Sequence, residues 1–521
     1  MVEQYLNNRL IVLYIAPFIL GLLTVFSFQP FNFSILNFFI LPLFFYLIVF
    51  IKKKSKSTYR KKPYRINLFI FGTIFGFSFF LSNIHWITNS LTFDENFRFL
   101  IPLGLILIPL FLSLFFSLIT IMVGPILSLN LSSIIIFSAS LALSDFVRAK
   151  ILTGFPWNLW AYSFSSLTEI IQILNIIGLF AFNLLSITIF MLPSILFFKL
   201  DFVKKILILL LLPAILFLSY IYGSHSINLN QKKLNDVEEK FNLKVISPNF
   251  ELIYGLDSEE IETRLKKLIK YSEPEKNLTT LFVWPEGVFS GYSFDEISKL
   301  KSIFKENFSK NHFILFGINK FSEKEKGVYN SLVITNYQLE ILQEYKKQKL
   351  VPFGEFLPME NLLSKIGLKK ITEGHGSFLK GQKQNNLIID KLNILPLICY
   401  EVIFTELIQS SNDKTNLIIN ISEDGWFGQS IGPYQHFTKS IFRAIENNTF
   451  LVRSANKGIS AIINNKGEIV KKLSSLEAGN IQIEVPLIES KNKNKNDLIF
   501  FVLLITYIFI FIFKFNKING K

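Results

Sequence analysis

Cysteine is nearly absent from the sequence. Cys399 is the only one among 521 residues, which excludes an intramolecular disulfide. Histidine is also scarce: the five residues are scattered and show neither an HExxH motif nor paired metal-ligand spacing. The glycines form no P-loop and no GxGxxG pattern, the motifs typical of nucleotide and dinucleotide sites. The sequence therefore predicts a site without a metal ion and without a cofactor.

Acidic residues are missing from one strongly basic stretch. Eight Lys and Arg, with no Asp or Glu, lie between Lys52 and Arg65 in a chain of formal net charge +15. A charge of that size raises the question of nucleic-acid binding, but this stretch is a short loop between two long apolar runs. Such a bias is typical of the cytoplasmic side of a membrane protein. We therefore expect a membrane and no nucleic acid as partner.

Long apolar runs fill the first part of the chain and return near its C-terminal end. Half of all residues are hydrophobic, and 57 are Phe, which is too apolar for one soluble domain. A bilayer crossing needs roughly 20 apolar residues. The runs predict eight spans, at 10–28, 33–51, 66–87, 99–126, 131–148, 169–198, 204–223 and 497–514. The fifth is weakened by Asp145 and Arg148, and the over-long sixth is expected to tilt or break near Pro193.

These runs divide the chain into three parts: an N-terminal membrane domain at 1–223, a globular domain at 224–496, and a last span with its tail at 497–521. Placing the basic loop in the cytoplasm puts the N-terminus there too, and seven crossings put the globular domain in the periplasm. The eighth span returns the C-terminus to the cytoplasm. Lysines at 491, 493 and 495 favour the opposite orientation, but the larger basic loop outweighs them.

The globular region alternates short β-rich runs with helical ones. Candidate strands are 243–247, 280–284, 313–316, 331–335, 394–398, 417–421, 450–453 and 459–463. Segments 259–271 and 435–447 show helical spacing, and 464–467 is typical of a hairpin turn. Alternating strands and helices predict a layered α/β core.

Three patches at the ends of β-rich runs together offer a carboxylate, an ammonium and a thiol: Glu286, Lys347 and Cys399. A thiol becomes a useful nucleophile as its thiolate, so Cys399 needs a base or a positive charge nearby. Glu286 is suited to take the thiol proton, and Lys347, with the N–H of Tyr400, to stabilise an oxyanion. Taken singly, Cys399 is most often a buried small hydrophobe, and the two charges are most often solvated. Their joint occurrence favours acyl transfer through a thioester.

The same patches resemble a known family. A Glu, a Lys and a Cys in this order are the signature of the nitrilase superfamily, and further segments are similar to apolipoprotein N-acyltransferases within it. These segments are WPE (284–286), LVPFGEFLP (350–358), ICYE (398–401), DGWFG (424–428), GPYQHF (432–437) and RSANKGIS (453–460), with SNIHW (82–86) and TGFPW (153–157) in the membrane part. By themselves, the last two are also typical of an interfacial belt. The resemblance covers nearly the whole chain.

The resemblance implies an α-helical polytopic membrane bundle of about eight spans with a nitrilase-like α/β domain, an αββα sandwich. It implies an N-acyltransferase of the bacterial inner membrane, acting as a monomer. This enzyme moves an acyl chain from a phospholipid, through a Cys thioester, to the α-amino group of the N-terminal diacylglyceryl-cysteine of apolipoproteins. By residue match, Glu286 is the base and Cys399 the nucleophile. Lys347 is preferred to Lys346 and Lys349 because it fits the family's Tyr-x-Lys-x-x-Leu spacing.

The resemblance also implies supporting roles for Glu355, Tyr400 and Glu401. One departure concerns a Trp that the family usually has soon after the first strand of this domain, in an arm that contacts the acyl chain. The stretch 247–254 has no Trp here, and Tyr254 is the candidate substitute.

Two other readings use the same sequence. A membrane-tethered amidase or nitrilase would use the same three residues on a small amide, but it would need one span rather than seven before the domain. A transporter or receptor with a degenerate soluble domain would carry charged residues at mid-membrane depth, and the spans contain almost none.

Overall fold

The computed structural model describes residues 8–58, 63–253, 255–358, 360, 377–409, 414–491 and 496–519. The chain divides into two compact units. The first, here the membrane unit, comprises Met1–Thr88, Glu95–Ser226 and Lys495–Lys521. The second, here the α/β unit, comprises Asn89–Asp94 and Ile227–Asn494.

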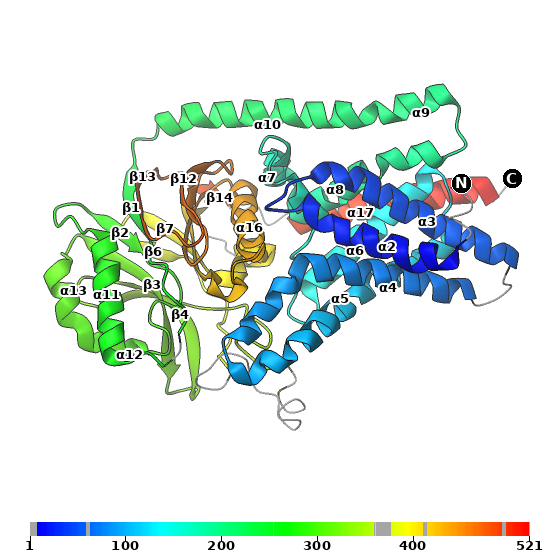
Figure 1. The fold of residues 1–521 in the computed structure, drawn as a ribbon. Helices are drawn as coiled ribbons and strands as arrows, with labels where there is room; N and C mark the ends of the chain where they lie inside the picture. The colour runs from blue at the N-terminus through cyan, green and yellow to red at the C-terminus, as the bar shows by residue number, and fades with distance from the viewer. Residues whose placement is uncertain are drawn as a thin grey trace. The chain divides into compact units, whose positions relative to one another are not determined.

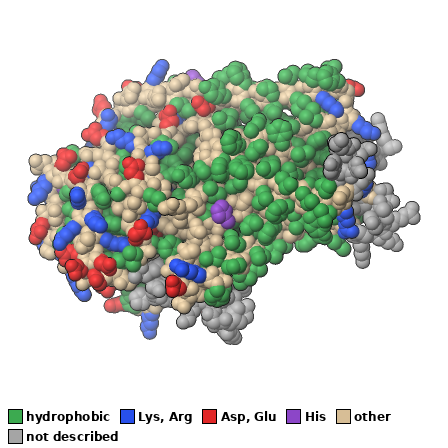
Figure 2. Space-filling model, viewed as in Figure 1, with side chains coloured by type: hydrophobic (Ala, Val, Ile, Leu, Met, Phe, Trp, Pro, Cys, Tyr) green, Lys and Arg blue, Asp and Glu red, His purple; other side chains and the backbone are tan. Residues whose placement is uncertain are grey.

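The membrane unit is built from apolar helices (Figure 1). Its longer elements are α2 (Ala16–Leu23), α3 (Asn37–Thr58), α4 (Pro63–Ile84), α5 (Ile101–Val123), α6 (Leu131–Lys150), α8 (Leu179–Met191), α9 (Phe202–Leu209), α10 (Leu211–Asn235, which continues into the α/β unit) and α17 (Asn496–Asn519). Hydrophobic side chains cover the visible surface of these helices, whereas charged side chains gather on the α/β unit (Figure 2). An apolar surface of this extent is typical of contact with lipid.

Seven helical segments in the described chain are long and apolar enough to cross a membrane. They are Ser34–Lys54, Tyr64–Thr92, Glu95–Ile126, Leu131–Lys150, Leu179–Phe197, Phe202–Asn235 and Asp497–Lys514. These seven segments correspond to the second to eighth predicted spans. The first predicted span, 10–28, corresponds to a shorter apolar helix, Ile11–Ser27. The expected break near Pro193 is present, because α8 gives way there to the 3-10 helix η9 (Leu192–Phe197). A second break lies at Gly178, whose φ is +77°.

Helix α4 packs closely on α5 because small side chains face each other. A Cβ atom added at Gly72 would lie 2.3 Å from Oγ1 of Thr120. That hydroxyl donates to the carbonyl oxygen of Leu68 at 2.8 Å, and the hydroxyls of Thr73 and Ser117 are also 2.8 Å apart. Within lipid, where the hydrophobic effect does not drive helices together, such close packing and hydroxyl bonds hold them.

The two charges of the fifth span form a buried pair within the membrane unit. Nη2 of Arg148 lies 2.8 Å from Oδ1 of Asp145, and the amide of Asn183 donates to Oδ2 at 2.9 Å. Arg148 also donates to the carbonyl oxygen of Phe155, and Asn183 accepts from the N–H of Ala161. These side chains therefore hold Phe155 and Ala161 in the segment that follows α6, which explains why a charged pair is tolerated there.

The α/β unit contains two six-stranded sheets (Figure 1). The first has the order β13-β1-β2-β3-β4-β5 and the second β12-β11-β10-β9-β7-β6. The strands are β1 (Lys240–Ser247), β2 (Thr280–Val283), β3 (His312–Ser322), β4 (Gly327–Thr335), β5 (Ile341–Lys346), β6 (Leu387–Ile389), β7 (Leu392–Ile398), β9 (Leu417–Glu423), β10 (Phe450–Asn456), β11 (Ser460–Ile463), β12 (Ile469–Leu473) and β13 (Gly479–Pro486), with β8 (Lys414–Thr415) and β14 (Ser490–Lys491) as a separate pair. Strands β1, β2 and β3 run parallel, as do β7, β9 and β10.

Alternating side chains build two apolar layers on the first sheet. In β2, Leu281 and Val283 enter the core shared by the two sheets, whereas Phe282 and the following Trp284 enter a second core. The second core is closed by α11 (Ser258–Ser272), α12 (Phe294–Ile297) and α13 (Lys301–Asn307). Helix α16 (Gly432–Asn447) packs against β10 and β11 of the other sheet. The unit is therefore the predicted αββα sandwich.

Candidate active site

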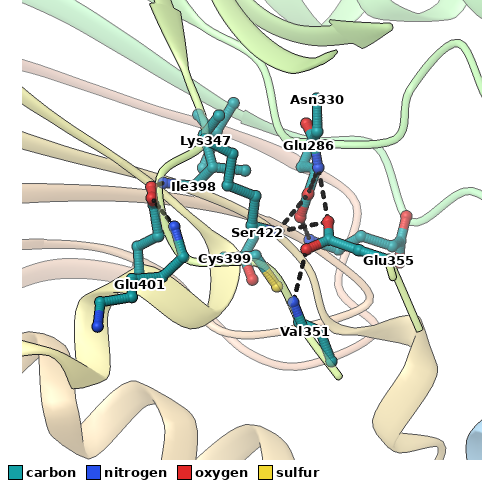
Figure 3. A network of polar contacts seen from close by, with 12 residues as sticks. Glu286, Asn330, Lys347, Val351, Glu355, Ile398, Cys399, Glu401 and Ser422 are labelled. Atoms are coloured by element: carbon teal, nitrogen blue, oxygen red, sulfur yellow. Dashed lines mark hydrogen bonds and ion pairs between the residues drawn. The ribbon is translucent and has the colours of Figure 1, made fainter. Parts of the chain in front are cut away.

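Each of the three predicted residues follows a strand of the sandwich. Glu286 lies just beyond β2 and Lys347 directly beyond β5, both in the first sheet. Cys399 directly follows β7 in the second sheet and begins the 3-10 helix η12 (Cys399–Ile403). Figure 3 shows that their side chains converge, with the sulfur of Cys399 directed toward the carboxylates of Glu286 and Glu355. The structure thus brings together residues that lie up to 113 positions apart in the sequence.

Lys347 lies between two carboxylates. Its Nζ is 2.7 Å from Oε1 of Glu355 and 3.4 Å from Oε1 of Glu286. The side chain of Lys347 is 1% exposed, against 11% and 12% for the two carboxylates. Asn330 donates its amide to the same two oxygens, at 2.8 Å to Glu286 and 2.9 Å to Glu355. The main-chain N–H of Val351 donates to the other oxygen of Glu355 (Figure 3). The main-chain N–H of Glu423 donates to the other oxygen of Glu286.

This arrangement keeps Lys347 charged. Burial alone would lower the pKa of the ammonium, but the charges of Glu286 and Glu355 outweigh burial, so the pKa is raised. Burial also raises the pKa of the Cys399 thiol well above its ordinary value, and the charge of Glu286 raises it further. The ammonium of Lys347 opposes both effects. Before substrate binds, Cys399 is therefore a protonated thiol beside a carboxylate that can accept its proton.

The backbone at Cys399 adopts an unusual conformation. Its φ is +51°, in the left-handed region that residues with a Cβ rarely occupy. Such a turn between a strand and a helix lifts the side chain away from the sheet, as in other enzymes that present a nucleophile at a sharp turn. A conformation of this kind costs about 1–3 kcal/mol and persists only where neighbouring groups hold it.

Glu401 holds the loop after β5 to the end of β7. One carboxylate oxygen accepts from the main-chain N–H groups of Gln348 at 2.7 Å and Lys349 at 3.0 Å. The other accepts from the N–H of Ile398 at 2.8 Å. Burial raises the pKa of Glu401 to about 7, although these bonds oppose the rise. Because the residues bound lie next to Lys347 and Cys399, this single side chain sets the distance between those two loops.

The other supporting residues lie in the same region. Glu355 binds Lys347 directly, as described, and its main-chain oxygen accepts from the N–H of Phe378. The ring of Tyr400 packs edge-on against Phe404, with centroids 5.0 Å apart. Tyr254, the candidate substitute for the family's Trp, lies outside the described residues.

Three residues of the site were missed from the sequence. Asn330 is adjacent to a predicted strand but carries no motif of its own, and Glu423 directly precedes the DGWFG segment. His436 is one of five scattered histidines in the sequence, and its Nε2 lies 3.2 Å from the carbonyl oxygen of Cys399. His436 lies within the GPYQHF segment of the resemblance and Glu423 directly before the DGWFG segment, but nothing in the sequence shows which side chains there face Cys399.

A cavity of about 450 Å³ lies beside the loop that carries Lys347. It is lined by residues 348–349, 380–383 and Leu407, which include three Lys and no acidic residue. Lys349 is paired with Glu406 at 2.7 Å, whereas Lys380 and Lys383 are exposed. The N–H of Gly381 donates to the carbonyl oxygen of Lys347 at 2.8 Å. The lining of the cavity is therefore positively charged. The main-chain hydrogen bond between Gly381 and Lys347 joins this lining to the site.

Metal binding has no support in the described residues. No group of three or more His, Cys, Asp or Glu side chains in that part of the chain could hold a metal ion. The carboxylates around Lys347 are instead satisfied by one ammonium, one amide and main-chain N–H groups. The chemistry that this set can perform is proton transfer, nucleophilic attack by sulfur and stabilisation of an oxyanion.

Both units of the chain match known protein families. Residues 20–192 match the apolipoprotein N-acyltransferase N-terminal domain, and residues 253–492 match the carbon-nitrogen hydrolase family. The apolipoprotein N-acyltransferase of Rickettsia typhi is 33% identical over 485 residues, which are 91% of this chain and 92% of that protein. The one of Rickettsia prowazekii is 34% identical and covers 80% of this chain and 83% of its own length. A nitrilase-superfamily structure from Saccharomyces cerevisiae covers 48% of this chain and 91% of its own, with 18% identity and a TM-score of 0.35. The chain therefore belongs to the apolipoprotein N-acyltransferase family.

Proposed function

We propose that this membrane protein transfers an acyl chain from a phospholipid to the α-amino group of a diacylglyceryl-cysteine at the N-terminus of apolipoproteins. The observation that carries the proposal is the arrangement of Glu286, Lys347 and Cys399 in a carbon-nitrogen hydrolase domain that follows an apolipoprotein N-acyltransferase N-terminal domain. A membrane-tethered amidase would use the same three residues, but it leaves the matching membrane unit without a role.

The first half-reaction forms a thioester. Glu286 takes the proton of the Cys399 thiol as the sulfur attacks the ester carbonyl of the phospholipid. The Nζ of Lys347 and the main-chain N–H of Tyr400 stabilise the oxyanion of the tetrahedral intermediate, each contributing on the order of 3 kcal/mol. As the carbon–oxygen bond breaks, Glu286 gives its proton to the departing alkoxide. Lysophospholipid leaves, and the acyl chain stays on the sulfur.

The second half-reaction transfers the acyl chain. The α-amino group of the acceptor attacks the thioester, and Glu286 takes a proton from the nitrogen. The carbon–sulfur bond breaks, an amide forms, and the sulfur recovers the proton from Glu286. Glu355 and Glu401 support both steps by holding Lys347 and its loop, and Tyr400 supports them through its main chain.

A phospholipid donor agrees with the surface and the cavity. Both substrates are lipids, and the membrane unit offers an apolar surface to the bilayer. The cavity beside Lys347 carries lysines suited to the phosphate of a headgroup. We assign residues 1–223 to the membrane domain, 224–496 to the catalytic domain and 497–521 to the last span and tail. The catalytic domain of the monomer faces the periplasm and both termini face the cytoplasm, as the basic stretch from Lys52 to Arg65 indicates.

The test is detection of the thioester. Purified protein given phospholipid without acceptor should gain the mass of one fatty acyl group, and neutral hydroxylamine should remove it. Lysophospholipid should appear in a burst of at most one per enzyme, and a diacylglyceryl-cysteine peptide should discharge the adduct as an N-acylated product. Cys399→Ser should show neither burst nor adduct, because a hydroxyl is too weak an acid for a carboxylate base. Steady release of free fatty acid without dependence on the peptide would instead indicate a hydrolase.

A further inference from the structure

The main-chain oxygen of Cys399 is held by a buried imidazole. Nε2 of His436, on α16, lies 3.2 Å from this oxygen. The amide of Asn420 also approaches this oxygen, at 3.4 Å, but it is closer to the carbonyl oxygen of Leu397 at 3.1 Å. His436 is fully buried, so its bond to Cys399 is shielded from water.

The partners of His436 contact both ring nitrogens. A carbonyl oxygen only accepts, so Nε2 carries the hydrogen and donates it to Cys399. Burial lowers the pKa of His436 and the charge of Arg453 lowers it further, whereas the charge and hydrogen bond of Asp424 oppose this. On the other side of the ring, Nδ1 lies 3.0 Å from both Nη2 of Arg453 and Oδ1 of Asp424. The ring is therefore fixed at both nitrogens.

Arg453 is itself fixed by Asp424. Its Nη2 donates to the two oxygens of Asp424 at 2.9 and 2.8 Å, and its Nη1 donates to Asn420. Ser422 donates to Asp424 at 2.7 Å. Burial would raise the pKa of Asp424, but the charge of Arg453 holds it well below its ordinary value, so the carboxylate stays ionised. All of these side chains are fully buried and lie on or beside β9 and β10.

This geometry excludes His436 as the base of a Cys–His pair. Its Nε2–H is directed at the main-chain oxygen of Cys399, and its Nδ1 faces Arg453 and Asp424. Neither nitrogen is therefore free to accept the thiol proton. What His436 does supply is a fixed donor at a residue whose backbone is strained, with φ at +51°.

We propose that His436 is a positioning residue, which holds the main chain of Cys399 in its left-handed conformation and so directs the sulfur toward Glu286 and Lys347. The inference rests on the proposed function for the identity of the nucleophile. A nucleophile displaced by about 1 Å loses on the order of 10²-fold in rate, so the effect of removing the donor is measurable. Asp424 and Arg453 act one step further away, because they fix the imidazole.

The test compares three substitutions of His436 with a matched control. His436→Leu removes the donor at similar volume, His436→Gln keeps an amide N–H within reach, and His436→Asn keeps the amide on a side chain too short to reach. His312 is the control, because it is equally buried in the same unit and its Nε2 also contacts a carbonyl oxygen, that of Glu275 at 2.9 Å. His312→Leu perturbs the fold without touching Cys399.

The rate of the first turnover with phospholipid should fall on the order of 10²-fold in His436→Leu and His436→Asn, with KM within about twofold. His436→Gln should recover most of the rate, and the shape of the pH–rate profile should not change. His312→Leu should retain the rate of the folded fraction. If His436→Leu fails to fold, the difference in rate between His436→Gln and His436→Asn tests the positioning role.

A second readout does not depend on acyl transfer. Cys399 is the only thiol, so its alkylation by iodoacetamide reports on the sulfur alone. We expect alkylation at pH 7.5 to slow in His436→Leu and His436→Asn, because a displaced sulfur loses the ammonium of Lys347, and to recover in His436→Gln. Equal alkylation rates in all His436 variants, or alkylation as slow in His436→Gln as in His436→Asn, would overturn the positioning role of His436. Failure of the wild type to form an adduct, with the alkylation pattern intact, would instead overturn the proposed function.

Discussion

The hydroxyl of Tyr345 lies 3.0 and 3.1 Å from the two carboxylate oxygens of Glu401. Tyr345 is in β5 of the first sheet, and Glu401 follows β7 of the second, so this contact joins the two sheets directly beside the site. Burial raises the pKa of the Tyr345 phenol, and the charge of Glu401 raises it further, so the hydroxyl remains a donor at neutral pH. With the three main-chain donors described above, Glu401 accepts hydrogen bonds from four residues.

Glu401→Gln should therefore damage the site more than its size suggests. An amide offers one accepting oxygen, and its NH2 group would face donors, so two or more N–H or O–H groups lose their partner at about 1–3 kcal/mol each. We expect a lower thermal midpoint and at least a tenfold loss in the rate of thioester formation. Tyr345→Phe is the matched control, because it removes one donor at about 1 kcal/mol and leaves the carboxylate in place. A rate of thioester formation in Glu401→Gln within twofold of the wild-type rate would contradict the role assigned to Glu401.

The three neighbouring lysines should differ sharply. Lys347→Met leaves two buried carboxylates without their cation, which costs about 3–5 kcal/mol, and it should abolish turnover. Lys346 lies over the ring of Tyr329 at 4.1 Å, and Lys349 forms a partly exposed pair with Glu406. Alanine at either position should cost at most about 1 kcal/mol and leave most of the activity.

Lys347→Arg should also fail, because a planar guanidinium cannot take the position of a compact ammonium between Glu286 and Glu355. Thioester formation and thermal unfolding of the same samples check these expectations. Near-normal turnover of a folded Lys347→Met sample would remove Lys347 from the site.

Much of the fold was predictable because it depends on local pattern. All eight predicted strands and both helices of the globular region are present, and the turn at 464–467 joins β11 to β12. The strands that were missed, such as β5, β12 and β13, carry charged or polar side chains on exposed faces and lack a continuous apolar run. Their pairing depends on the neighbouring strand rather than on their own sequence.

The site was predictable only in part. Glu286, Lys347 and Cys399 lie at strand ends, and a motif identifies each of them. Asn330 was not predictable, because an Asn within a strand has no signal until the fold places it beside two carboxylates. The same holds for His436, which contacts Cys399 from a helix 37 residues away. Contacts that depend on the packing of one sheet or helix on another leave no periodic pattern in the sequence.

Glu423 should make stability fall as pH rises. Burial raises its pKa to about 8, although bonds from Asn456 and Gly425 oppose the rise. A carboxyl whose pKa is higher in the folded state stabilises the fold below its unfolded pKa of about 4.5. That contribution is lost progressively up to about pH 8. In unfolding measurements, Glu423→Gln should remove this contribution to the slope of unfolding free energy against pH between pH 5 and 8. The lost bond to Asn456 adds an offset in that free energy that does not depend on pH. Glu489→Gln, at an exposed carboxylate, is the control and should keep the slope; an unchanged slope in Glu423→Gln would contradict the prediction.

The proposed orientation is testable by thiol labelling. In a Cys399→Ala background, Lys53→Cys places a thiol in the exposed, basic C-terminal part of α3, and Lys324→Cys places one on an exposed turn of the α/β unit. An impermeant maleimide applied to intact cells, after opening of any outer membrane, should label the second and spare the first. Both should be labelled after detergent treatment. Labelling of the α3 position in intact cells would reverse the orientation.

The lysines of the cavity should govern affinity for the donor rather than the chemical step. Lys380 and Lys383 border the cavity without an acidic neighbour in its lining, and the main chain of Gly381 ties this segment to Lys347. A charged contact to a phosphate is worth about 1 kcal/mol where solvent reaches it, or roughly fivefold in affinity. Lys380→Gln with Lys383→Gln should therefore raise KM for phospholipid by about tenfold or more, with kcat nearly unchanged and the difference shrinking at high salt. Lys391→Gln, at an exposed lysine paired with Glu239, is the control and should leave KM unaltered.

If inorganic phosphate competes with the lipid in the wild type but not in the double variant, the cavity recognises the phosphate itself. An unchanged KM in the double variant would exclude the cavity from donor binding.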